Sequence, residues 1–154
     1  MEHRIALSRS IAAPPSAVWR VLTDIDDAAR TLNGVTGIER LDATGYEVGT
    51  RWRETRVMFG KSAAEEMRVA EVEPERRTIV TAESGGTTYR TVFELAPRAD
   101  GTELSVEFSG ATDSPGLFTR IMTPVFGPLA MRATSKALQC DLDDIATAAE
   151  RTTL

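Results

Sequence analysis

The C-terminal part of the chain, residues 114–149, is the only stretch long enough to form a major helix. It follows a series of strand patterns, so this helix has the face of a sheet to cover. Pro124 and Pro128 interrupt it, and a proline inside a helix removes a backbone donor and clashes with the preceding turn. We therefore expect one helical part over residues 115–123, a break, and a second part over residues 129–151.

The two parts differ in their apolar residues. In the second part these residues recur at helical spacing, and we expect the stripe to be core: Met131, Leu138, Leu142, Ile145 and Ala149. The first part and the break carry large, adaptable side chains, namely Phe118, Met122 and Phe126. Such side chains suit a pocket wall as well as a core, and the sequence leaves both interpretations open.

Ahead of this helix the chain alternates between strand patterns and turn signals. Residues 4–11 predict a first strand, and Pro14 and Pro15 then start a short helix, because proline suits the first helical position. A second short helix is expected over residues 27–32. Six further strands are expected over residues 35–41, 50–58, 63–72, 78–84, 87–96 and 102–110. Short turns join these strands, so they should form an antiparallel meander.

Two hairpins allow a prediction of register. A loop at Gly60-Lys61 would place Trp52 opposite Val69, Glu54 opposite Met67 and Arg56 opposite Glu65. This register gathers apolar side chains on one face, which we take as the concave one: Trp52, Met58, Met67 and Val69. Glu54, Arg56 and Glu65 then share that face. A loop at Gly85-Gly86 similarly pairs Ala82 with Tyr89 and Val80 with Thr91, and puts Tyr89 and Phe93 on one face.

Composition excludes several classes of function. The net charge of −5 and the mixing of arginines with glutamates argue against a nucleic-acid partner. With one cysteine (Cys140) and one histidine (His3), neither an internal disulfide nor a zinc site is expected. No cofactor-binding glycine motif, membrane-spanning run or secretory signal is found, so we expect a cytoplasmic protein without cofactor or metal. Residues 1–154 are expected to form a single domain.

Several motifs resemble one known superfamily. They are residues 10–19 (Ser-Ile-Ala-Ala-Pro-Pro-Ser-Ala-Val-Trp) with Leu22-Thr23-Asp24, residues 48–52 (Val-Gly-Thr-Arg-Trp), residues 69–74 with Arg76-Arg77, and Asp100-Gly101-Thr102. With the order of the elements, they resemble the helix-grip fold of the START/Bet v 1-like (SRPBCC) superfamily, in particular its polyketide cyclase/dehydrase-like branch. The resemblance implies an α+β fold: a seven-stranded curved antiparallel sheet (β-α-α-β6-α) around a long, proline-interrupted C-terminal helix. It also implies a cavity between sheet and helix, and it carries over no catalytic residue.

The favoured function is binding of a small hydrophobic or amphipathic molecule of lipid, polyketide or aromatic type. Its apolar walls would come from Trp52, Tyr89, Phe93, Phe108, Phe118, Met122 and Phe126. Polar groups that would orient the ligand are Arg9, Glu54, Arg56 and Tyr89. Arg9 is included because it falls on the apolar face of its strand, where a charged residue conflicts with the pattern. The alternative is that these side chains simply fill the core.

Two other functions stay open. The first is a polyketide cyclase/dehydratase-type enzyme in which Glu54 is the base, because an apolar site brings the pKa of a carboxyl nearer that of a general base. Arg56 or Arg9 would then stabilise an oxyanion and Tyr89 would donate a proton. In the structural alternative, Arg56 and the glutamates Glu54 and Glu65 only neutralise one another. The second function is a protein-interaction module, and a homodimer is compatible with all three.

Overall fold

The computed structural model describes residues 2–42, 45–58, 60–84, 86–112 and 128–152. In chain order the elements are β1 (Glu2–Ile11), α1 (Pro15–Thr23), the 3-10 turn η1 (Ile25–Asp27), α2 (Ala28–Thr31), β2 (Val35–Arg40), β3 (Arg51–Met58), β4 (Lys61–Glu73), β5 (Arg77–Ser84), β6 (Thr87–Arg98), β7 (Gly101–Thr112) and α4 (Pro128–Arg151). This is the predicted α+β helix-grip architecture. The expected first helical part lies outside the described residues, together with Phe118, Met122 and Phe126.

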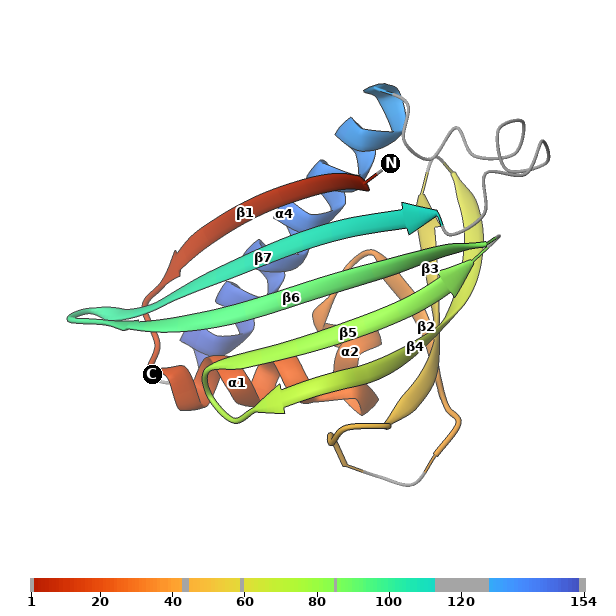
Figure 1. Ribbon diagram of the computed structural model, residues 1–154. Helices are drawn as coiled ribbons and strands as arrows, with labels where there is room; N and C mark the ends of the chain where they lie inside the picture. The colour runs from red at the N-terminus through yellow and green to blue at the C-terminus, as the bar shows by residue number, and fades with distance from the viewer. Residues whose placement is uncertain (1, 43–44, 59, 85, 113–127, 153–154) are drawn as a thin grey trace.

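The strands form one seven-stranded antiparallel sheet in the order β1-β7-β6-β5-β4-β3-β2. Every neighbouring pair except β1–β7 is consecutive in the chain, as expected for a meander. Figure 1 shows the sheet curving around α4, with α1 and α2 beneath one end. Register shifts between Val69 and Glu71 in β4, and between Val35 and Gly37 in β2, add to this curvature, because a bulge bends its strand.

The core lies where α1 and α4 meet the sheet. From α4 it takes Leu142, Ile145, Ala146 and Ala149, all at most 3 % exposed. The predicted helix stripe is therefore confirmed at Leu142, Ile145 and Ala149, whereas Met131 and Leu138 are only half-buried. A second, smaller core of Ile25, Trp52, Val69 and Val80 lies between the turn η1 and strands β3–β5.

The β6–β7 turn illustrates why one residue must be glycine. Gly101 has φ +151°, and a Cβ atom on it would lie 2.0 Å from the backbone oxygen of Ile11. The next residue, Thr102, is buried and donates its hydroxyl to the carbonyl of Ala13 at 2.7 Å. The tip of this hairpin is thus pressed against the segment that joins β1 to α1.

The predicted register was wrong in one hairpin and correct in the other. In β3–β4, Met58 pairs with Lys61, so Trp52 lies opposite Met67 and Glu54 opposite Glu65. Gly60, at φ +72°, is therefore followed directly by the strand instead of by a second loop residue. The error is two residues, and because side chains alternate with a period of two, the predicted faces are unchanged. In β5–β6 the predicted pairs Ala82–Tyr89 and Val80–Thr91 are both observed.

Candidate ligand-binding cavity

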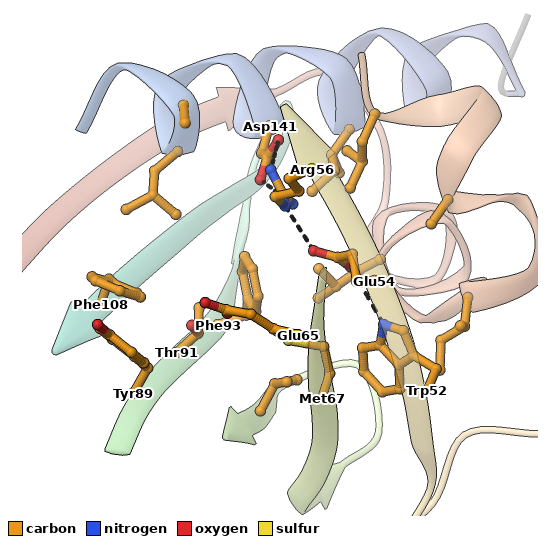
Figure 2. Close-up of a pocket in the computed structure, with 18 of the residues that line it drawn as sticks. Trp52, Glu54, Arg56, Glu65, Met67, Tyr89, Thr91, Phe93, Phe108 and Asp141 are labelled. Carbon is orange, nitrogen blue, oxygen red and sulfur yellow. Dashed lines mark hydrogen bonds and ion pairs between the residues drawn. The ribbon is translucent and has the colours of Figure 1, made fainter. Parts of the chain in front are cut away.

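A cavity of about 430 Å³ lies between the concave face of the sheet and the helices. The sheet supplies residues from β3 to β7, and the remainder comes from the helices α1, α2 and α4, the turn η1 and the segments beside them, including Tyr46 between β2 and β3. Most of the lining is apolar, and its described members from the sheet are Trp52, Glu54, Arg56, Glu65, Met67, Val80, Ser84, Tyr89, Thr91, Phe93 and Phe108. Figure 2 shows these strands facing α4 across the cavity. The predicted cavity is therefore present.

A network of charged side chains forms one end of the cavity. Trp52, Glu54 and Arg56 alternate along β3, so all three point to the concave face. Arg56 donates from Nε to Glu54 Oε2 at 2.7 Å, from Nη1 to Asp141 Oδ1 at 3.2 Å and from Nη2 to Asp141 Oδ2 at 2.8 Å. The indole of Trp52 donates to the other oxygen of Glu54 at 3.3 Å. Figure 2 shows this chain of contacts from α4 to Trp52.

The network keeps Arg56 charged. Burial alone would lower the pKa of Arg56, but Asp141 and Glu54 together raise it above its usual value. Burial raises the pKa of Asp141, and the guanidinium of Arg56 opposes that shift. Since the guanidinium is bound on both sides by carboxylates, this part of the site is a closed ion-pair network.

Glu65 lies directly opposite Glu54 on the neighbouring strand β4. Burial raises the pKa of Glu65, the charge of Glu54 raises it further, and Arg56 lowers it. Among the described residues, no side chain or backbone group donates a hydrogen bond to the side-chain carboxyl of Glu65. In Figure 2 its side chain extends across the cavity toward Thr91 and the aromatic residues. This carboxyl is thus available to a molecule in the cavity.

Aromatic side chains form the opposite part of the cavity. Tyr89 and Phe108 stack with ring centroids 5.6 Å apart and an interplanar angle of 19°. Burial and the charge of Glu65 raise the pKa of Tyr89.

Tyr46, from the segment between β2 and β3, packs edge-on against Trp19, and its hydroxyl lies 2.7 Å from the hydroxyl of Thr78. Burial raises the pKa of Tyr46 to about 12.

The structure brings most of the predicted site residues together. Six of them line the cavity: Trp52, Glu54, Arg56, Tyr89, Phe93 and Phe108. Arg9 does not, because its guanidinium donates to Asp143 on α4. The other three, Phe118, Met122 and Phe126, lie outside the described residues.

Asp141 was not among the site residues predicted from the sequence. It is 7 % exposed and lies three residues after Leu138 and four before Ile145. An acid at that spacing belongs to the apolar face of the helix, and a charge on such a face is a signal for a partner within the protein. Glu65 was placed on the correct face but not among the site residues.

Within the described ranges, no group of three or more histidine, cysteine, aspartate or glutamate side chains is arranged to hold a metal ion. No helix in the same ranges is long and apolar enough to cross a membrane.

The fold and the cavity together define a class: a helix-grip protein with an internal, mostly apolar cavity. Residues 2–150 match the family model described as polyketide cyclase / dehydrase and lipid transport, and the chain belongs to this family. Among curated proteins, no sequence matches significantly.

Solved structures share the fold at low sequence identity. The Zhui aromatase/cyclase from Streptomyces sp. R1128 is 16% identical, with a TM-score of 0.83 over 100% of this chain and 97% of that one. The protein TTHA0849 from Thermus thermophilus is 19% identical, with a TM-score of 0.79 over 99% of this chain and 100% of that one. CV1439 from Chromobacterium violaceum is 23% identical, with a TM-score of 0.69 over 96% and 97%. These similarities support the fold.

Proposed function

We propose that the protein binds a small hydrophobic or amphipathic molecule, of lipid, polyketide or aromatic type, in the cavity between the sheet and α4. The cavity itself carries this proposal. Its volume of about 430 Å³ lies within the range of sites for drug-sized ligands, and its lining is mostly apolar with a few convergent polar groups. Family membership supports the same function.

The experiment compares two substitutions on one strand. Thr91 lines the cavity, whereas Thr88 lies on the outer face of β6. Thr91→Phe should therefore fill part of the cavity, and Thr88→Phe should not. With the neutral fluorophore N-phenyl-1-naphthylamine as probe, we expect Thr91→Phe to weaken binding at least about tenfold and Thr88→Phe to leave it within about twofold, where tenfold corresponds to 1.4 kcal/mol.

Native mass spectrometry of the protein purified from its own host gives an independent measurement. A bound small molecule, lost on denaturation, is the expected result. Failure of the wild-type protein to bind the fluorophore, together with a ligand-free native mass, would contradict the proposal. Equal effects of the two phenylalanine variants would show that the probe binds elsewhere.

A second candidate function is proton transfer on a bound ketone, as in a cyclase or dehydratase. Glu54 was the expected base, but its two oxygens accept from Arg56 and Trp52. Glu65 is the better placed proton acceptor, because it faces the cavity and burial raises its pKa. Tyr89, which also lines the cavity, is the candidate donor.

This alternative is tested by exchange of the α-hydrogens of 1-tetralone in D₂O, followed by mass spectrometry. An enzyme of this type should accelerate the exchange, and Glu65→Gln should abolish the acceleration. If the wild-type protein binds the ketone without accelerating exchange, proton transfer at this site is excluded for that substrate. The protein-interaction alternative has no comparable support, since the exposed large apolar side chains among the described residues are only Val48, Val57 and Leu129.

A further inference from the structure

We propose that the ligand of this cavity carries a positively charged amine, which binds to Glu65 beside the aromatic rings of the cavity. The inference rests on the proposed binding function and narrows its ligand to one chemical class.

Arg56 is the only basic side chain among the described residues that line the cavity. Its Nε, Nη1 and Nη2 atoms all donate to carboxylates of Glu54 and Asp141. A guanidinium binds a carboxylate through the same fork of donors, and here that fork is already filled by Asp141. A carboxylate ligand would therefore have to displace an ion pair whose side chains are only 26% and 10% exposed.

The described lining of the cavity carries more carboxylates than cations. Among the described lining residues, Glu54, Glu65 and Asp141 face the one cation, Arg56, and Asp24 adds a fourth carboxyl at the exposed side. Charges interact more strongly where water is displaced, so this excess of negative charge disfavours an anion and favours a cation. Fatty acids and other carboxylates are the ligands that it disfavours most.

Glu65 is the residue to which a cation would bind. Like charges directly opposite each other on adjacent strands destabilise a sheet, and Glu54 and Glu65 are such a pair. The carboxylate of Glu54 is stabilised by Arg56 and Trp52, whereas no described residue donates a hydrogen bond to the carboxyl of Glu65. An ammonium group supplies both the donor and the opposite charge that Glu65 lacks. A neutral hydroxyl supplies only the donor.

The aromatic residues favour the same group. Tyr89 and Phe108 are stacked, and Phe93 lines the cavity beside them. Figure 2 shows Glu65 reaching toward this side of the cavity. The faces of aromatic rings attract cations, so a carboxylate beside several rings suits an amine on an apolar or aromatic body.

The experiment uses three probes with the same ring and different head groups: 1-naphthylmethylamine, 1-naphthylmethanol and 1-naphthoate. Isothermal titration at neutral pH should give an affinity for the amine at least about tenfold higher than for the alcohol, and weaker binding still for the carboxylate. The preference for the amine should persist at high salt, because a buried pair is screened little.

Two variants with the same change of charge make the result specific. Glu65→Gln should reduce the affinity for the amine about tenfold and leave the alcohol within about twofold. Glu66→Gln is the control, because Glu66 is the next residue of β4, is exposed and contacts Arg51 outside the cavity. It should change neither affinity. Glu65→Asp, which keeps the charge, should retain a preference for the amine.

The outcomes separate the two proposals. If the alcohol binds as tightly as the amine, or if Glu65→Gln weakens both equally, the amine inference is wrong while the binding cavity stands. A preference for the carboxylate would also overturn it and would show that Arg56 is available to ligands. If none of the three probes binds and N-phenyl-1-naphthylamine does not bind either, the proposed binding function itself fails.

Discussion

The ion pair between Arg56 and Asp141 should be strongly coupled, and a double-mutant cycle can measure this coupling. The pair is bidentate, with N–O distances of 2.8 and 3.2 Å. Two unit charges about 4 Å apart interact by roughly 4 kcal/mol at an effective dielectric constant of about 20. Since the Arg56 side chain is 26% exposed, we expect screening by water to reduce the coupling free energy to about 2–3 kcal/mol.

The cycle uses Arg56→Met, Asp141→Leu and the double variant. Asp141→Leu should lower the free energy of unfolding by about 3 kcal/mol, because it leaves a buried guanidinium with one partner fewer. For a chain of this length that loss lowers Tm by roughly 6–12 °C. The double variant should lose less than the sum of the single variants, although Glu54 then stays without its guanidinium.

A matched pair on the same helix provides the control. Arg9 and Asp143 also join the sheet to α4, but their side chains are 33% and 51% exposed. Their coupling, measured with Arg9→Met and Asp143→Leu, should be below about 1 kcal/mol. The assay is urea unfolding at neutral pH, followed by far-UV circular dichroism. Equal couplings for the two pairs, or a value below about 0.5 kcal/mol for Arg56–Asp141, would refute the reasoning. Such a result would mean that Arg56 is available to bind anionic ligands.

Three further predictions concern stability. Gly101→Ala should cost about 3 kcal/mol or more, because its Cβ would overlap the oxygen of Ile11, whereas Gly86→Ala (φ +81°), with nothing within 4 Å, should cost less in the same urea assay. Tyr46 has a pKa raised to about 12 in the folded state, so its contribution is complete below about pH 10 and is lost as pH rises toward 12; this amounts to roughly 2–3 kcal/mol, and Tyr46→Phe should remove that pH dependence. The pKa of Glu65 is also raised in the folded state, which disfavours its ionised form there; Glu65→Gln should therefore raise the urea midpoint at neutral pH but not below about pH 4, and a lower midpoint at neutral pH would contradict the assignment.

The composition of the concave face could be predicted from the sequence, because it depends on a period of two. Trp52 and Arg56 share a face of β3 because side chains alternate along a strand, and Met67 of β4 shares that face as long as the register changes by an even number. The pairing itself could not be predicted, because Gly60 fits either position of a two-residue turn. The direct opposition of Glu54 and Glu65, on which the ligand inference depends, became visible only in the structure.

The positions of Arg9 and Asp141 depend on how α4 is rotated over the sheet. Arg9 was expected to face a ligand, but α4 packs against β1, and Asp143 meets the guanidinium there. Asp141, two residues earlier, points instead toward Arg56 on β3. A helical pattern specifies which side chains share a face, whereas the rotation of that face follows from tertiary packing that no local sequence window contains.

Neighbouring residues of α4 reach opposite borders of the sheet. Asp143 binds Arg9 on β1, and Asp144 accepts two hydrogen bonds from Asn33, just before β2. Since β1 and β2 are the edge strands, the helix connects the two edges of an open sheet. Edge strands present unpaired backbone groups with which strands of other molecules can pair, and a sheet that is able to flatten exposes these groups more fully. A double Asp143→Asn, Asp144→Ala variant removes both polar contacts while the buried face of α4 still holds the helix on the sheet, so we expect it to increase self-assembly with only a small loss of stability.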